Sequence, residues 1–267
     1  MALISAVVCP HPPGLVPAVA GDAAGDWDRV RRACMDAVRG LDIPVWGPET
    51  YREGREKFFE ERLKAATTPE VVVIVGGAEV TRSYDPSGAY ASLRAAGMDW
   101  EYGWEGSGPP EPMPPTLSIG YWLLCTAKPA GIIVTKDVVL QSVAFDASPQ
   151  ECADLGRELA GRADRVAMLV LGEGSAIRGV TTRPHPESRA GYHDREVARA
   201  LSEANTEWLA GLRPQASRPV NATGRAAWQV LAGAAGGQRF RSEMLHRPGS
   251  GEVGYFVVKW LRDTMIR

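Results

Sequence analysis

The sequence predicts one α/β domain whose central sheet is mostly parallel or mixed and is flanked by helices. Apolar runs typical of buried strands alternate along the chain with amphipathic segments typical of helices. The clearest run, Val71–Val75, consists of β-branched residues only, which favours a strand covered on both faces. No shift in composition marks a linker, so residues 1–267 are expected to form a single domain.

The first quarter of the chain supplies a strand, two helices and a second strand. Leu3–Val8 is apolar and runs into a proline-rich loop, which indicates a buried strand. Asp26–Arg39 and Tyr51–Ala66 each carry an apolar stripe with helical spacing. The strand at Val71–Val75 is expected to stop at Gly76 and Gly77.

The middle of the chain begins with a segment of little periodicity. Tyr84–Pro115 is rich in Gly, Pro and Trp and is expected to be a long loop region. Leu117–Ala127 is expected to be a helix, and Gly131–Thr135 and Val138–Phe145 are expected to be strands. Ser148–Arg162 shows a complete helix start: a serine N-cap, a proline at the first helical position and a glutamate three residues after the cap.

The last third continues the alternation of strands and helices. Val166–Leu171 is a buried strand that ends in Gly-Glu-Gly-Ser. Asp194–Leu212 and Thr223–Ala235 are expected to be helices, and Val253–Leu261 alternates loosely as a closing strand.

Composition and charge exclude several classes of partner. The net charge of -2 and the absence of a basic, aromatic-rich surface pattern argue against nucleic acid and anionic membranes as partners. The four cysteines have no CxxC pairing, which is typical of reduced thiols in an intracellular protein. The start of the sequence lacks a signal-peptide pattern and no window is apolar enough to cross a bilayer, so a cytoplasmic location is expected.

Polar residues follow three of the expected strands, where open α/β sheets bind their ligands. His11 lies in Cys-Pro-His-Pro-Pro, and the stiff loop suits either a metal ligand or a general base. Gly76 and Gly77 allow a ligand to approach closely, and Glu79 beside them is a candidate metal ligand or a solvated loop residue. In the third strand end, Glu173 and Ser175 are candidate catalytic residues and Arg178 is a candidate substrate-binding residue; the alternative is a simple tight turn.

The remaining candidates are less specific. Trp100 and Trp104 could wall an aromatic pocket or simply cap the core. His185 and His193 are eight residues apart in a polar stretch, which is not a standard metal spacing, so a surface loop is favoured for both. His246 is expected in another loop.

Several of these motifs resemble the class III extradiol ring-cleavage dioxygenases, the LigB-like family, in an actinobacterial branch. The resemblance rests most on the start, Ala6–Pro13 followed by Leu15–Pro17, and on Gly224–Ala234 with its tryptophan Trp228. It continues through the strand ends at Val71–Gly77 and Leu169–Ala176 and through further motifs over nearly the whole chain. It implies an α/β fold, a small aromatic or phenolic substrate, an Fe(II) held by two histidines and one carboxylate, and association into homo-oligomers.

Only part of the family's iron site has a counterpart in this sequence. His11 matches the first metal histidine, whereas Gly76–Ala78 stands where the second should follow its strand, leaving Glu79 as the nearest ligand. The family's catalytic histidine falls in Gly172–Ser175, and its carboxylate ligand falls in Gly224–Ala227; neither residue type is present there.

Two hypotheses of different classes follow. The first is an enzyme with a rebuilt site, in which His11, Glu79 and Glu173, with His185 or His193, hold a metal or act as acid and base. The second is a non-catalytic or metal-independent member of the family that binds a small molecule or a partner subunit.

Overall fold

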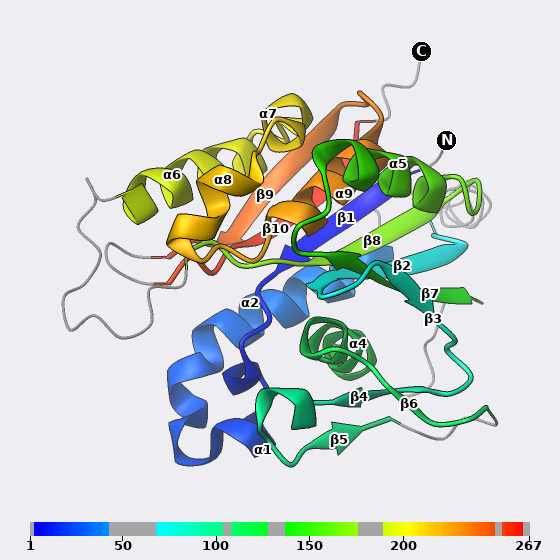
Figure 1. Cartoon of the computed structure of the whole chain (residues 1–267), viewed down its shortest axis with the longest axis vertical. Coiled ribbons are helices and arrows are strands. Elements are labelled where there is room, and N and C mark those ends of the chain that lie inside the picture. Colours follow the sequence, from blue (N-terminus) through cyan, green and yellow to red (C-terminus); the bar gives the residue numbers. More distant parts are fainter. Residues whose placement is uncertain are drawn as a thin grey trace, which may run out of the picture.

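The computed structural model describes residues 3–42, 68–103, 108–127, 137–175, 189–248 and 253–263, and the structural statements below concern these residues. They form an α/β structure in which helices cover both faces of a central sheet (Figure 1). The predicted fold class is therefore confirmed. No helix in this part of the chain combines the length and the apolar character needed to cross a bilayer.

The central sheet is mixed, with the strand order β3-β7-β2-β8-β1-β10-β9. The strands β7, β2, β8 and β1 run parallel to one another, whereas β3, β10 and β9 pair antiparallel. The four parallel strands therefore end at one common edge. The bounds are β1 Leu3–Cys9, β2 Val71–Ala78, β3 Arg82–Tyr84, β7 Asp137–Ala144, β8 Val166–Leu171, β9 Phe240–His246 and β10 Val257–Arg262.

The sheet separates two hydrophobic cores, and side chains alternate between them along each central strand. In β8, Val166, Met168 and Val170 enter one core. The intervening side chains of the same strand enter the other core. All residues of β8 are buried, which explains why an uninterrupted apolar run predicted this strand with its observed bounds.

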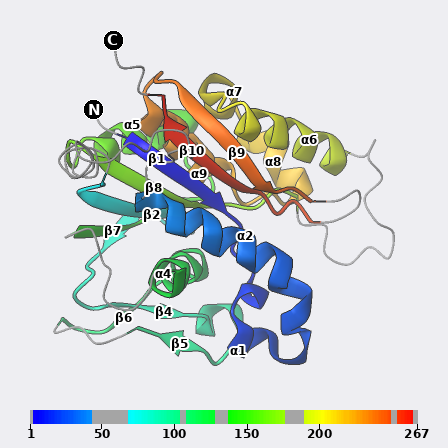
Figure 2. The ribbon, with the colours of Figure 1, turned by 180° about the vertical axis from the view of Figure 1, so that it is seen from behind.

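Helices form the two outer layers (Figures 1 and 2). The core on one side is closed by α5, α6, α7 and α9, and the core on the other side by α2 and α4. The short helices α1 and α8 lie in connecting segments. The bounds are α1 Pro17–Ala20, α2 Asp28–Arg39, α4 Pro115–Ala127, α5 Pro149–Ala160, α6 Arg189–Ser202, α7 Thr206–Ala210, α8 Pro214–Ser217 and α9 Arg225–Ala235.

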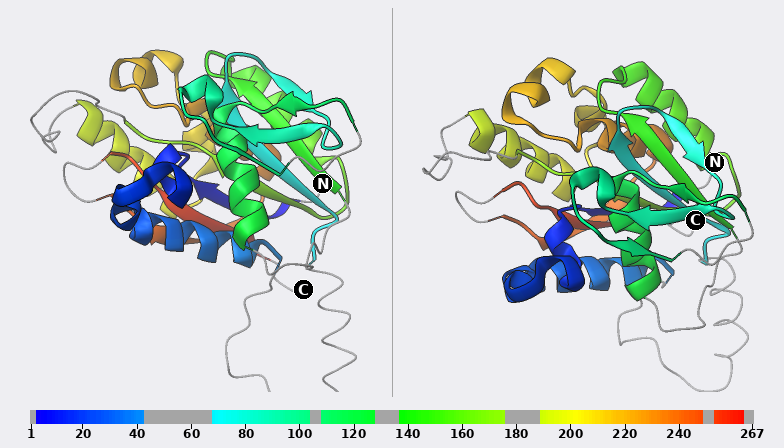
Figure 3. Two further views of the ribbon diagram at one scale, coloured as in Figure 1. Left: turned by 90° about the horizontal axis from the view of Figure 1, so that it is seen from below. Right: turned by 60° about the horizontal axis from the view of Figure 1, so that its bottom comes forward.

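A second, three-stranded sheet with the order β5-β4-β6 lies beyond α4, so that α4 separates it from the main sheet (Figures 1 and 3). Its strands are β4 Ala89–Ser92, β5 Glu101–Tyr102 and β6 Glu111–Pro112. The expectation of a long loop over Tyr84–Pro115 is wrong in this respect. Strands of two to four residues are too short to show a period, so only pairing with one another reveals them.

The start of α5 confirms its predicted cap. The Ser148 hydroxyl accepts the Glu151 N–H at 3.2 Å, and the Ser148 N–H donates to the Glu151 carboxylate at 2.7 Å. These bonds satisfy backbone groups that no helical partner can reach. The same N–H, donated to the charged form, holds the pKa of the Glu151 carboxyl below its ordinary value.

Several element boundaries differ from the prediction, two of them for a clear structural reason. β2 does not stop at Gly76 and Gly77 but continues through both to Ala78, because the two glycines stay in register with β7. The helix expected over Asp194–Leu212 is two helices, since Ala204 takes φ 49° and Asn205 caps α7 by accepting the Trp208 N–H at 2.9 Å.

β9 was not predicted, and His246 was placed in a loop although it ends this strand. β9 is an edge strand with a partly exposed face, so its polar composition suits its position but hides the strand from hydropathy. The predicted helix Tyr51–Ala66 and the predicted strand Gly131–Thr135 lie outside the described residues.

Candidate functional site

The carboxyl ends of β1, β8 and β2 bring three of the predicted site segments to one edge of the sheet. His11 follows β1, Glu173 follows β8 and Glu79 follows β2. Because β8 lies between β1 and β2, Glu173 is next to His11 and Glu79 is one strand further away. This edge is where parallel α/β sheets bind ligands.

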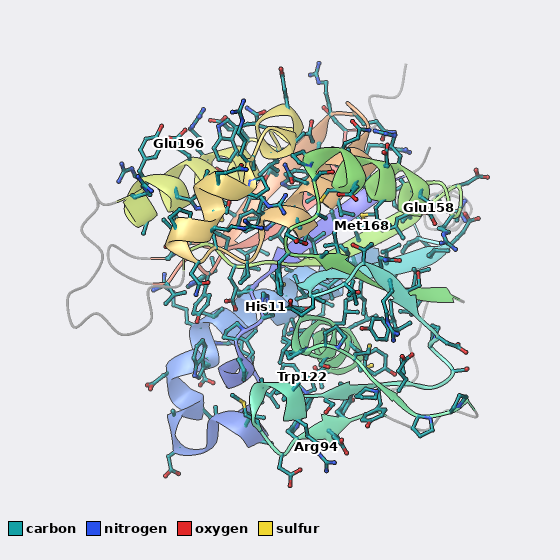
Figure 4. All side chains as sticks on the ribbon, viewed as in Figure 1. His11, Arg94, Trp122, Glu158, Met168 and Glu196 are labelled. Atoms are coloured by element: carbon teal, nitrogen blue, oxygen red, sulfur yellow. The ribbon has the colours of Figure 1, made fainter. Side chains whose placement is uncertain are left out.

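His11 and Glu173 form the core of the candidate site. The β1–β8 ladder continues beyond the strand ends, since the Gly172 N–H donates to the Cys9 carbonyl at 3.0 Å. It brings the His11 N–H within 3.1 Å of Glu173 Oε1, and the His11 Nδ1 lies 3.9 Å from the same oxygen. Only 12% of the imidazole and 10% of the carboxylate side chain are exposed. Figure 4 shows His11 in the middle of the molecule, where β1 leaves the sheet.

Three buried polar atoms around this pair have no hydrogen-bond partner in the described structure: His11 Nδ1, Thr223 Oγ1 and Trp228 Nε1. They come from different segments: His11 Nδ1 lies near the Glu173 carboxylate, Trp228 Nε1 packs at Gly172, and Thr223 precedes the N-cap residue of α9. The Gly224 N–H, next to Thr223, donates to the Glu173 carbonyl at 2.8 Å. Native structures leave few buried polar groups unpaired, so this grouping marks a place for a ligand.

The close packing at this point requires glycine. A Cβ on Gly172 would lie 2.8 Å from both Trp228 Nε1 and Gly224 Cα, and a Cβ on Gly224 would lie 2.3 Å from the Trp228 ring. Both distances are shorter than carbon atoms tolerate. Gly172 and Gly224 therefore let α9 approach the end of β8.

A partly buried carboxylate, Asp194, holds the loop after Glu173. Asp194 accepts the Ser175 N–H at 2.8 Å and also accepts the Ser175 hydroxyl. The neighbouring Gly174 N–H donates to the Gly254 carbonyl at 2.7 Å. The Ser175 hydroxyl is thus engaged with Asp194, and its predicted catalytic role stays a prediction.

His193 extends this buried network from α6. Its Nδ1 lies 3.4 Å from Asp194 Oδ1 and its Nε2 lies 3.3 Å from the Ser217 hydroxyl. His193 is 7% exposed, so the expectation that it belongs to a surface loop is wrong. The polar sequence around it hid a helix whose inner face carries the histidine.

Two of the other predicted site residues are glycines inside the central sheet. Gly76 and Gly77 lie within β2, where a Cβ would meet the Thr116 side chain at 2.8 Å and the Phe145 ring at 2.4 Å, respectively. Both positions are therefore filled by side chains from α4 and from the segment after β7. Their role in substrate binding stays a prediction.

Glu79 and Trp100 also stay predictions. Glu79 is exposed. Trp100 stacks on Tyr102 with 6.1 Å between ring centroids, and its carbonyl accepts the Leu93 N–H at 3.0 Å. Its side chain also packs against the core that α2 and α4 close, in agreement with the alternative that it caps the core. Trp104, Arg178 and His185 lie outside the described residues.

The thiol closest in sequence to His11 is not available for chemistry. Cys9 ends β1 and is fully buried beside Cys34 of α2. Burial, followed by the hydrogen bond with the Cys34 thiol, raises the pKa of the Cys9 thiol well above its ordinary value. A thiol kept protonated in this way is a poor nucleophile.

Among the described residues no group of three His, Cys, Asp or Glu side chains is placed to hold a metal ion. His11 and Glu173 together provide two ligands, whereas the two-histidine, one-carboxylate iron site needs three. The described donor set therefore does not fit Fe(II) by itself.

Comparison with known proteins leaves the family open. No family model matches the chain, and no curated protein matches it. Among solved structures, it is similar to the uncharacterized protein JW3007 from Escherichia coli K12, with 14% sequence identity and a TM-score of 0.43. The match covers 96% of this chain and 99% of that chain.

Proposed function

We propose that this protein is a LigB-like enzyme that acts on a small hydroxylated aromatic molecule, with His11 and Glu173 as its acid–base pair. The observation that carries the proposal is the buried, unpartnered His11 Nδ1 beside the Glu173 carboxylate. The family assignment is supported by the resemblance of the segments Ala6–Pro13 and Gly224–Ala234.

The geometry of the pair suits proton transfer. Glu173 Oε1 accepts the His11 N–H, which fixes the carboxylate next to the imidazole. The 3.9 Å between Nδ1 and Oε1 is too long for a hydrogen bond, so both atoms can still accept a proton from a third group. A substrate hydroxyl placed against them would pass its proton to Glu173 or to His11 and keep the electron pair on its oxygen.

Fe(II) remains a prediction from the resemblance. If the chain binds it, His11 and Glu173 are the described residues that would serve as ligands, and the metal would supply oxygen chemistry. Proton transfer by this pair does not depend on a metal.

A second candidate function is binding without catalysis, of a small molecule or of a partner subunit. It is favoured by the segment Gly224–Ala227, where the resembled family has a carboxylate and this chain has none. Turnover separates the two candidates, because both predict that a ligand binds near His11.

The first test is metal content by mass spectrometry, on protein purified without chelator and again after anaerobic loading with Fe(II). Each preparation is then offered catechols and aminophenols under O2, and deuterium uptake by the ring is followed in the metal-free protein. We expect turnover or exchange by the wild type and its loss in Glu173→Gln and His11→Ala. Their melting temperatures should stay within a few degrees of wild type, since neither side chain fills a core.

Glu158→Gln is the matched control, because this glutamate is exposed on α5 and, within the described part of the chain, its ion pair is with Arg162 just after the same helix (Figure 4). It should leave turnover unchanged. Ligand binding without any turnover or exchange would support the non-catalytic candidate instead, and loss of folding in His11→Ala would assign His11 a structural role.

A further inference from the structure

We propose that the first turn of α9, together with Thr223 and Trp228, binds an ionised oxygen of the ligand, a carboxylate or a phenolate. This inference rests on the proposed function, because it concerns the same site. Beyond the proposed function, it specifies the charge and the hydrogen-bonding character of the ligand group that the site accepts.

The start of α9 is an uncapped helix end directed at the candidate site. Its N-cap is Gly224, so no side chain accepts from the first N–H groups of this eleven-residue helix. The Gly224 N–H donates to the Glu173 carbonyl, which places the helix start beside the acid–base pair. The partial positive charge of a helix N-terminus favours anions.

Trp228 provides an independent reason to expect a ligand there. Its side chain is fully buried, and its Nε1 has no partner. The indole packs against the N-cap Gly224, and Nε1 lies at Gly172 next to Glu173. The fully buried Trp260, in contrast, donates its Nε1–H to the Leu201 carbonyl at 2.8 Å.

The unpaired groups define the chemistry of the missing partner. An indole N–H can only donate, and the Thr223 hydroxyl can donate as well. Helix N–H groups are also donors. A ligand atom that completes this set must therefore be an acceptor, and an ionised oxygen accepts the strongest such bonds.

The charge of the first turn points in the same direction. Arg225 is 2% exposed, and its guanidinium donates to the Phe145 carbonyl at 2.6 Å and to Gln229 Oε1 at 2.7 Å, both neutral acceptors. Among the described residues no carboxylate lies within ion-pair distance of it. Burial lowers the pKa of Arg225 and outweighs the opposite effect of the neighbouring Cys152 thiol, while Arg218 adds a second positive charge nearby. A buried cation is costly unless an anion balances it.

The acidic groups near this turn do not cancel its attraction for an anion. Asp146 lies close enough to Arg225 to act on it, although it forms no ion pair with it. When Glu173 receives the proton of the substrate hydroxyl, the negative charge lost from the carboxylate appears on the ligand oxygen. α9 would then stabilise the oxyanion as it forms.

The test measures binding of two probes, benzoate for the carboxylate and 4-nitrophenol for the phenolate, whose ionised form absorbs visible light. Calorimetry gives both affinities, and absorbance reports how much of the bound nitrophenol is ionised. We expect wild type to bind at least one probe as the anion. Trp228→Phe and Thr223→Val should each weaken that binding about tenfold or more, because a hydrogen bond to a charged group is worth about 1.5–3 kcal/mol.

Trp260→Phe is the matched control, because it replaces an equally buried indole outside the site. It should change the affinity for either probe less than twofold. If Trp228→Phe fails to fold, Thr223→Val carries the test alone. If the protein binds only one of the two probes, that probe shows whether the site accepts a carboxylate or a phenolate.

Three results would overturn the inference: no binding of either probe, binding of nitrophenol only in its neutral form with no binding of benzoate, or affinities unchanged in both site variants. The proposed function fails separately. If Trp228→Phe weakens probe binding while Glu173→Gln keeps normal turnover, the acid–base role of the pair is refuted and the oxyanion site is supported. Unchanged binding in Trp228→Phe together with lost turnover in Glu173→Gln would do the reverse.

Discussion

At the scale of single residues, two buried tryptophans with the same exposure have different roles. Trp260 and Trp228 are both fully buried in the same core. Trp260 donates to the Leu201 carbonyl and so stabilises the link between β10 and α6, whereas Trp228 leaves its donor unused beside Glu173. An unused buried donor lowers stability, and such groups are typical of sites that serve a ligand.

This difference predicts opposite rankings for stability and for binding. Replacing either tryptophan by phenylalanine removes a similar apolar volume, but only Trp260→Phe also breaks a hydrogen bond. Trp260→Phe should therefore lower the free energy of unfolding by about 1 kcal/mol more than Trp228→Phe does. Urea denaturation of both variants measures this difference in the free energy of unfolding. Equal losses of free energy would show that the Trp228 N–H has a hydrogen-bond partner in solution.

At the scale of elements, the position of Glu173 depends on how the loop after β8 is fastened. Asp194 of α6 accepts two hydrogen bonds from Ser175, and Gly174 is bonded to the Gly254 carbonyl before β10. On the other side the Glu173 carbonyl accepts the N-cap N–H of α9. Three elements thus direct one carboxylate toward His11.

Asp194 is consequently expected to position Glu173. In Asp194→Ala the loop loses both bonds from Ser175, so the His11 N–H should lose its acceptor and exchange its proton faster. Ser175→Ala removes only the hydroxyl bond and should have a smaller effect. Hydrogen exchange measured by NMR at His11 reports this directly, with amides in the middle of β8 as the reference. Equal acceleration at both places would mean general destabilisation and no positioning role.

At the scale of the whole molecule, the site depends on α5 because α5 holds α9 against the sheet. The two helices cross at glycine positions: a Cβ on Gly156 would lie 2.1 Å from the Val230 carbonyl oxygen, and a Cβ on Gly233 would lie 2.5 Å from the Ala153 carbonyl oxygen. Backbones approach this closely only where no side chain intervenes.

A single methyl group at this crossing should therefore act on both the fold and the site. Gly156→Ala is expected to lower the free energy of unfolding by about 1–3 kcal/mol, because the helices must separate. It should also weaken probe binding by displacing the start of α9. Gly25→Ala is the control, since no atom lies within 4 Å of its new Cβ, and it should stay within about 0.5 kcal/mol of wild type. Thermal unfolding of both variants decides; a stable Gly156→Ala would show that α9 can shift freely.

The fold class and the central strands could be predicted from the sequence, because fully buried parallel strands leave an uninterrupted apolar pattern. Val166–Leu171 was predicted with its observed bounds, and the cap at Ser148 was predicted from local spacing alone. The sequence also singled out His11 and Glu173, since stiff or glycine-flanked polar residues at strand ends are visible without a structure. The LigB-like family, the Fe(II) cofactor, the homo-oligomer and the cytoplasmic location remain predictions.

Which of these residues lie close together could not be predicted from the sequence and is seen only in the tertiary structure. The strand order places β8 next to β1, so Glu173 reaches His11 and Glu79 does not stand beside it. The tertiary structure also decided what local patterns cannot show: strands too short to have a period, an edge strand with polar residues, and a buried His193 in a polar stretch. The unused donors of Trp228 and Thr223 belong to this second kind, because whether a polar atom is satisfied depends on segments far apart in the chain.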